Sequence, residues 1–306
     1  MTVAPPVSSP RTLAAAYAVL AEGVARTGEP ARTGEPARTG EPARTVAPIA
    51  GGTDLMVALT GELGEPPASI LDLWALDDLR GIAIDGDRLV LGALTTYAEI
   101  RRSPACREHL PALAEAAATI GAAQIQGRGT IGGNAANASP AGDTLPLLLA
   151  CDATLVLGSV RGEREVAAAD FWTGYRQTAL AADELIVRIA FPLRSEREVR
   201  FRKVGTRRAQ SISKVVMAVA WRDGAPTRVW RDVRVALGSV AATPIRAPRT
   251  EAVLEGMPPT PEHADRAGET LAAELAPIDD VRSTAEYRRV VAARILHRIV
   301  RDAGGW

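Results

Sequence analysis

The sequence predicts an α+β fold with at least two domains. A chain of 306 residues is longer than one hydrophobic core usually supports. Short apolar segments bounded by Gly, Asp or Pro alternate with segments whose apolar residues recur at helical spacing. The composition, 47% hydrophobic and 24% charged, is typical of a globular protein. Because 36 basic residues balance 36 acidic ones, the charge gives no indication of a nucleic-acid partner.

The N-terminal region predicts one helix and then a repeat. Ser9-Pro10-Arg11-Thr12 precedes apolar residues at helical spacing, which predicts a helix over about 12–23. The hexapeptide Ala-Arg-Thr-Gly-Glu-Pro then occurs at 25–30, 31–36 and 37–42, and begins again at 43. Its Gly and Pro, and the absence of any apolar residue larger than Ala, predict a flexible surface insertion over 25–45. A regulatory or docking role is the alternative.

The remaining elements follow from apolar periodicity. A charged stretch at 194–200 is the predicted domain boundary, which gives domains of 1–193 and 197–306. The pattern predicts strands at 46–50, 69–73, 88–94, 153–158, 185–191, 215–221 and 233–237, and helices at about 110–120, 262–275 and 284–303.

A glycine pair directly after the first of these strands is the first candidate site. The segment reads Pro48-Ile49-Ala50-Gly51-Gly52-Thr53-Asp54-Leu55. Glycines there let backbone N–H groups approach a diphosphate and donate to its oxygens. An ordinary strand-to-helix turn is the alternative. Because the segment fits neither GxGxxG nor GxxxxGK[ST], a Rossmann or P-loop site is disfavoured.

A second glycine-rich segment covers 127–143. It contains Thr130-Ile131-Gly132-Gly133-Asn134 and ends at Asp143. We predict an ordered loop that crosses the interior, whose backbone groups need partners. A dinucleotide would supply them, with the amides facing phosphate oxygens, Asn134 bonding the diphosphate or the flavin side, and Asp143 accepting from ribose hydroxyls. A structural loop satisfied by itself and water is the alternative.

The cysteines and histidines predict neither a metal site nor a nucleophile. Cys106 and Cys151 lie far apart without a CxxC pair, and the three histidines are scattered. An iron–sulfur cluster takes four thiolates, so any such cluster must belong to another chain. The start of the chain has neither a signal-peptide pattern nor a long apolar span, which predicts a cytoplasmic protein without a membrane partner.

Taken together, the motifs resemble the flavin subunit of the molybdopterin hydroxylases, the family of xanthine dehydrogenase, carbon monoxide dehydrogenase and aldehyde oxidases. AGGTDL and TIGGNAANASPAGD occur in the family's order. The segment 171–178, FWTGYRQT, resembles its FFxGYRxT, and 201–208, FRKVGTRR, resembles its FxKxxxRR. The resemblance runs from about residue 46 to the C-terminus.

The resemblance implies an FAD-binding domain of the vanillyl-alcohol oxidase (PCMH-type) superfamily. Its two lobes would cover about 1–60 and 61–193, followed by a C-terminal domain with a small antiparallel sheet and helices. Pro48–Leu55 and Thr130–Asn134 would contact FAD, and Asp143 would lie on the adenosine side. Lys203 would lie beside the isoalloxazine ring, where an ammonium stabilises the negative charge of a reduced flavin. Ile120 and Ile186 match apolar cofactor contacts.

One position departs from the family pattern. After the Arg pair the family carries an Asp where this chain has Ser211, so no carboxylate role is assigned there. The implied function is an electron-transfer subunit without catalytic residues of its own. It would take electrons from a [2Fe-2S] small subunit fed by a molybdopterin-binding large subunit, and pass them to NAD or another acceptor. The alternatives are a carbon monoxide dehydrogenase-type subunit, a stand-alone flavin oxidase, and an assembly subunit that has lost FAD.

Overall fold

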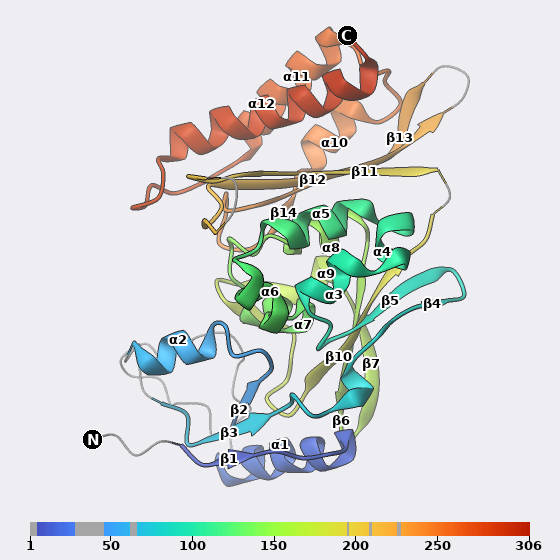
Figure 1. Ribbon diagram of the computed structural model, residues 1–306. Coiled ribbons are helices and arrows are strands. Elements are labelled where there is room, and N and C mark those ends of the chain that lie inside the picture. The colour runs from blue at the N-terminus through green and yellow to red at the C-terminus, as the bar shows by residue number, and fades with distance from the viewer. Residues whose placement is uncertain (1–4, 28–45, 62–65, 195, 208–209, 225–227) are drawn as a thin grey trace.

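The computed structural model describes residues 5–27, 46–61, 66–194, 196–207, 210–224 and 228–306. It has three layers along its length (Figure 1): a small sheet with a long helix and the short helix α2 (Leu55–Thr60) at the bottom, a larger sheet with short helices in the middle, and a third sheet under three helices at the top. The predicted α+β class is confirmed. Among the described helices, none combines the length and the apolar character that a membrane crossing needs.

The bottom layer is a parallel sheet of order β1-β3-β2. Its strands are β1 (Val7–Ser8), β2 (Val46–Ile49) and β3 (Ser69–Asp72). Because β3 is the central strand, the lobe boundary predicted near residue 60 would cut this sheet, and the lobe extends at least to Asp72.

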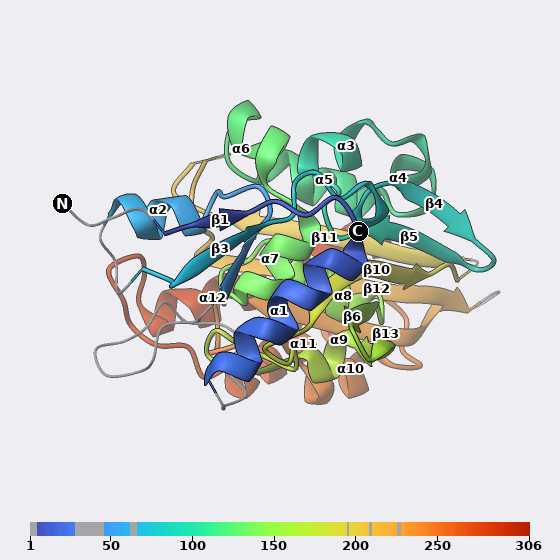
Figure 2. The same cartoon turned by 90° about the horizontal axis from the view of Figure 1, so that it is seen from below.

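Helix α1 (Leu13–Thr27) packs against this sheet and crosses the lower end of the molecule beside the middle layer (Figure 2). Its buried Ala16 and Leu20 share a cluster with Leu71. Residues 25–27, the start of the first hexapeptide, form the last turn of α1 and are not part of an insertion. The rest of the predicted insertion, 28–45, lies outside the described residues.

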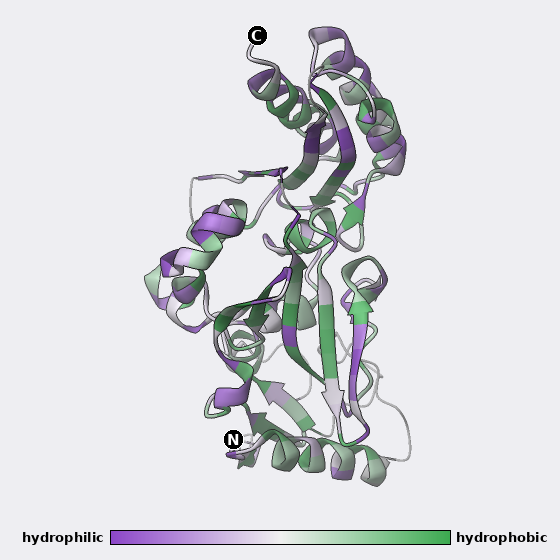
Figure 3. Ribbon diagram, turned by 90° about the vertical axis from the view of Figure 1, so that its right-hand side faces the viewer, coloured by the Kyte–Doolittle hydropathy of each residue, from purple (hydrophilic) through white to green (hydrophobic). Residues whose placement is uncertain are grey.

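The middle layer is an antiparallel sheet of order β4-β5-β10-β6-β7. Hydrophobic residues concentrate in its strands (Figure 3), which pack against the short helices. The strands are β4 (Ile82–Asp85), β5 (Arg88–Gly92), β6 (Thr154–Ser159), β7 (Gly162–Ala167) and β10 (Leu185–Pro192). The helices are α3 (Tyr97–Arg102), α4 (Pro104–His109), α5 (Pro111–Thr119), α6 (Ala123–Arg128), α7 (Ile131–Asn137), α8 (Leu145–Ala150) and α9 (Ala168–Phe171).

The top layer is an antiparallel sheet covered on both faces. Alternate residues of β12 face opposite clusters: Met217 and Val219 face the three C-terminal helices, whereas Ala218 and Ala220 face the middle layer. This explains the continuous apolar run in the sequence. The strands are β11 (Arg197–Val204), β12 (Val215–Gly224), β13 (Val229–Gly238) and β14 (Ile245–Arg246), and the helices are α10 (Pro248–Leu254), α11 (Pro261–Glu274) and α12 (Ala285–Gly304).

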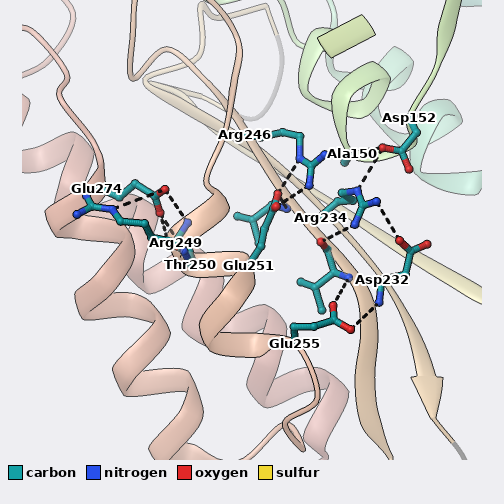
Figure 4. Close-up of polar contacts among 12 residues, drawn as sticks. Ala150, Asp152, Asp232, Arg234, Arg246, Arg249, Thr250, Glu251, Glu255 and Glu274 are labelled. Atoms are coloured by element: carbon teal, nitrogen blue, oxygen red, sulfur yellow. Dashed lines mark hydrogen bonds and ion pairs between the residues drawn. The ribbon is translucent and has the colours of Figure 1, made fainter. Parts of the chain in front are cut away.

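A network of ion pairs joins the middle and top layers. Asp152, which follows α8, pairs with Arg197 at 3.1 Å and with Arg234 at 3.2 Å. Arg234 also reaches Asp232, as Figure 4 shows. The charged stretch 194–200 is therefore not a plain linker, because Arg197 begins β11 and its guanidinium is buried between the layers.

Candidate functional site

One cleft collects almost all of the predicted cofactor residues. It has a volume of about 2000 Å³ and is lined by residues from all three layers. Ile131 and Lys203 do not line it: Ile131 is buried, and Lys203 pairs with Asp143, which does line it. The predicted residues that line the cleft are Pro48, Ile49, Ala50, Gly51, Gly52, Thr53, Asp54, Leu55, Ile120, Thr130, Gly132, Gly133, Asn134, Asp143 and Ile186.

The first glycine segment offers free backbone donors to the cleft. It leaves β2 at Ile49 and turns at Gly52, whose φ of 75° is rare for residues with a β-carbon. Within the described part of the chain, the N–H groups of residues 51–54 have no hydrogen-bond acceptor. Consecutive unpaired N–H groups in a turn form an anion-binding concavity. The segment can therefore hold the oxygens of a phosphate group.

Gly51 also brings the two glycine segments into contact. A β-carbon at Gly51 would lie 1.7 Å from the carbonyl oxygen of Arg128, a distance that no real atom pair adopts. The glycine is thus required by packing between the segments, in addition to any approach of a ligand. Asn137 strengthens the same contact, because its Nδ2 donates to Asp54 Oδ1 at 3.0 Å.

The second glycine segment is not the loop that the sequence predicted, because part of it forms α7. The hydroxyl of Thr130 caps the helix by accepting from the Gly133 N–H at 3.1 Å. The N–H groups of Ile131 and Gly132 donate to the carbonyls of Thr95 and Ala93 at 3.0 and 2.9 Å. These amides are used inside the protein, so the expectation that they face phosphate oxygens does not hold.

Asn134 and Ile186 reach the cleft in different ways. The N–H of Asn134 donates to the Thr130 carbonyl, and its Oδ1 accepts from Thr144 Oγ1 at 2.6 Å. Only its side-chain NH₂ group therefore remains for a ligand, among the described contacts.

Ile186 is buried on β10, whereas Ile120 is half-buried after α5, and both present apolar surface to the cleft.

Asp143 and Lys203 form a buried ion pair, with Lys203 Nζ 2.6 Å from Asp143 Oδ2. The ammonium also donates to the Thr119 carbonyl at 3.3 Å. The sequence prediction placed Asp143 at the adenosine end of FAD and Lys203 at the flavin end. An extended FAD separates these ends by its diphosphate and ribityl chain, so both assignments cannot hold. Residues this close contact the same end of any extended ligand that binds beside them.

The carboxylate of Asp143 fits a polyhydroxyl ligand. Its Oδ1 is buried and has no hydrogen-bond partner among the described residues, although Oδ2 is paired. Burial raises the pKa of Asp143 by more than the charge of Lys203 lowers it. A buried acceptor without a donor is costly, so a ligand hydroxyl or N–H at this position would relieve the cost. The residues present therefore fit FAD.

Sequence reasoning missed two residues that connect the motifs. Arg176 lies in the turn between β8 (Trp172–Gly174) and β9 (Gln177–Thr178), and its Nη1 donates to Asn137 Oδ1 at 2.9 Å. Both residues line the cleft. The GYR motif was visible in the sequence and could have identified Arg176, but only the fold shows that it meets Asn137.

Ser211, which stands where the family carries an acid, also lines the cleft. Its Oγ donates to the Arg207 carbonyl at 3.0 Å. A β-carbon at Gly205 would lie 2.2 Å from the same Oγ, so this serine is packed against its own loop. Ser211 therefore has a local structural role.

Both cysteines are free and buried. Burial raises the pKa of Cys151 to about 12 and also raises that of Cys106. Thiols with such pKa values are neither nucleophiles nor metal ligands at neutral pH. In the described residues, no group of His, Cys, Asp and Glu is arranged to hold a metal ion.

Two family models together match most of the chain. Residues 8–194 match the family model "FAD binding domain in molybdopterin dehydrogenase", and residues 200–303 match "CO dehydrogenase flavoprotein C-terminal domain". The chain is 33% identical to the nicotine 6-hydroxylase medium subunit of Paenarthrobacter nicotinovorans, over 84% of this chain and 89% of that subunit.

Two further comparisons cover most or all of the chain. It is 30% identical to the xanthine dehydrogenase FAD-binding subunit of Escherichia coli O157:H7, over 84% of this chain and 89% of that subunit. The fold is similar to a chain of the reconstituted CO dehydrogenase from Oligotropha carboxidovorans, with a TM-score of 0.87, 29% identity, and coverage of 100% of this chain and 99% of that one.

Proposed function

The chain belongs to the family of FAD-binding subunits of molybdenum hydroxylases, and from this premise we propose that it passes electrons from partner iron–sulfur clusters to NAD in a xanthine dehydrogenase-like enzyme. The observation that carries the proposal is the cleft, which combines free backbone donors at residues 51–54 with the buried pair of Asp143 and Lys203. FAD, when bound, supplies the change between one-electron and two-electron transfer that such a relay needs.

We assign the diphosphate to the first glycine segment. The N–H groups of residues 51–54 are unpaired among the described residues, whereas those of residues 131–134 in the second segment are used internally. Backbone donors that are already in place bind an anion without further ordering of the chain. The second segment then has a supporting role, because Gly51 packs on Arg128 and Asp54 bonds Asn137.

We assign Asp143 and Lys203 to the flavin end. Asp143 Oδ1 would accept a hydrogen bond from the ribityl chain or the ring, which satisfies the buried atom without a partner. Lys203 lies 2.6 Å from Asp143, and its charge opposes the rise that burial causes in the pKa of Asp143. The charges of Lys203 and Asp143 largely cancel. Lys203 therefore stabilises the negative charge of a reduced flavin less than an isolated ammonium would.

The partners that we propose are a molybdopterin-binding large subunit and a [2Fe-2S] small subunit. The chain's two cysteines are buried apart from each other and cannot hold a cluster. Similarity to proteins named as medium and FAD-binding subunits supports this assembly. Two unpaired thiols are typical of a reducing compartment, which supports a cytoplasmic location.

We propose a nitrogen heterocycle as the substrate of the whole enzyme, because the relatives named above include a nicotine 6-hydroxylase and a xanthine dehydrogenase. Carbon monoxide is the second candidate, which the similarity to the CO dehydrogenase chain favours. Substrate choice belongs to the large subunit and not to this cleft.

The electron-transfer proposal is tested on the enzyme purified from its source cells through a tag on this chain. We expect xanthine or nicotine to bleach the visible flavin absorbance and to support NAD⁺ reduction. Bleaching by carbon monoxide alone would establish the second candidate. A flavin that neither substrate type reduces, in an enzyme shown to contain both partner chains, would refute the relay.

A further inference from the structure

A diphosphate bound at the first glycine segment would lie close to a carboxylate of the same segment. If the proposed function holds, the diphosphate of FAD lies beside residues 51–54, and this segment also carries the exposed carboxylate of Asp54. Backbone N–H groups supply only partial positive charge. A full cation nearby would remove the repulsion between the carboxylate and the phosphates.

Four arginines of the described chain line the cleft, and three of them have other partners. Arg282 and Arg288 both pair with Asp280, at 3.4 and 2.7 Å. The guanidinium of Arg207 donates to the Gln210 carbonyl at 3.0 Å. Arg176 differs, because no described carboxylate lies within ion-pair distance of it and its bond to Asn137 uses one of its five N–H donors.

The position of Arg176 connects it to the first glycine segment. Its Nη1 lies 2.9 Å from Asn137 Oδ1, and Asn137 Nδ2 lies 3.0 Å from Asp54 Oδ1. Two consecutive hydrogen bonds therefore join the guanidinium to the segment that offers free N–H groups. The φ of Arg176 is 52°, a conformation that residues with a β-carbon seldom adopt and that the hairpin turn fixes.

We propose that Arg176 is the cation that neutralises the FAD diphosphate, and that Asn137 positions it. A guanidinium offers a planar fork of donors that matches two phosphate oxygens, and charge-assisted bonds of this kind are stronger than neutral ones. Asn137 uses both ends of its amide, one on Arg176 and one on Asp54, so the arginine and the glycine segment are fixed relative to each other. This assigns a binding role to the arginine of the GYR motif.

The test measures how fast FAD leaves the purified holoenzyme on dilution, followed by flavin fluorescence over a range of NaCl concentrations. Arg176→Gln should raise the dissociation rate roughly 10- to 100-fold, because it removes a charge-assisted bond. It should also flatten the salt dependence, since one ionic contact is lost. Arg176→Lys should recover part of the affinity and most of the salt dependence. Arg294→Gln, at an exposed site on α12, is the matched control and should behave as the wild type.

Three results separate the possible failures. A wild-type enzyme without FAD would overturn the proposed function itself. A wild-type enzyme with FAD, together with an Arg176→Gln enzyme of unchanged dissociation rate and salt dependence, would overturn only the role of Arg176. If the Arg176→Gln enzyme does not assemble, the Asn137→Asp enzyme tests the proposal in its place. That change gives Arg176 a competing carboxylate and should accelerate FAD release by a similar factor, so an unchanged rate would overturn the proposal.

Discussion

Lys203 of β11 donates to Asp143 across 2.6 Å, and this pair connects the top layer to the segment between α7 and α8. The side chains of Lys203 and Asp143 are only 5% and 10% exposed, so water screens the pair little. The pair thereby holds β11 against the segment that carries Asp143, and it makes both residues sensitive to single substitutions.

Lys203→Met should therefore destabilise the protein by about 3–5 kcal/mol, because it leaves the Asp143 carboxylate buried without its partner. The double change Lys203→Met with Asp143→Asn should recover a large part of this loss, since no buried charge remains. Urea unfolding of the three variants measures the effect. Equal stabilities for the single and double variants would show that the ion pair does not account for the loss.

Gly132→Ala should destabilise the fold by about 1–3 kcal/mol through overpacking. The added β-carbon would lie 2.6 Å from Ala93 Cβ and 2.7 Å from its carbonyl oxygen, which is backbone that cannot rotate away. Gly127→Ala in α6 is the matched control, because nothing lies within 4 Å of the added carbon. We expect Gly127→Ala to be neutral or to raise the Tm, and a Gly132→Ala protein with the wild-type Tm would contradict the packing.

The ion pairs that Asp232 of β13 makes with Arg194 and Arg234 should fail in acid. Burial raises the pKa of Asp232, but attraction from Arg234 and Arg194 outweighs burial, and the net shift is downward. A lowered pKa in the folded state means that the unfolded chain binds the proton more tightly. The stabilisation from the ion pairs of Asp232 is thus complete above the ordinary Asp pKa of about 3.9. It disappears as the pH falls through the lower pKa that Asp232 has in the folded protein.

Asp232→Asn should flatten the fall of stability in this acid window while it lowers stability at neutral pH. Thermal unfolding at a series of pH values measures both effects. A variant whose stability falls as steeply as that of the wild type would exclude Asp232 from the acid transition.

The two cysteines should be unreactive in the folded protein, because burial raises the pKa of each thiol, that of Cys151 to about 12. A colorimetric thiol reagent at neutral pH should detect no thiol before denaturation and two per chain after it. Rapid labelling of the folded protein would show that one cysteine is accessible, against the burial described here.

The turn in the first glycine segment could be predicted because its cause is local: a glycine pair after an apolar strand favours a turn, and Gly52 adopts a positive φ. Helix α7 was missed because Gly132 and Gly133 are poor helix formers. The cap at Thr130 and the close packing on Ala93 compensate for these glycines. The cap can be found in the local sequence, whereas the packing on Ala93 cannot.

Contacts between distant segments could not be predicted. Asp143 and Lys203 are 60 positions apart, and Asn137 and Arg176 are 39 apart. Each residue looked like a separate motif element, and the contact between Asp143 and Lys203 conflicts with roles at opposite ends of FAD. The order of strands that brings these segments together depends on long-range pairing, which periodicity does not encode.

The central claim is that this chain binds FAD through the cleft, and the most direct measurement is the cofactor content of the enzyme purified through a tag on this chain. FAD released by denaturation and identified by mass spectrometry should be present at one molecule per chain. Asp143→Ala should lower that content, because it removes the acceptor Oδ1 and leaves Lys203 unpaired. An assembled wild-type enzyme without bound FAD, or an Asp143→Ala enzyme with full FAD content, would contradict the site described here.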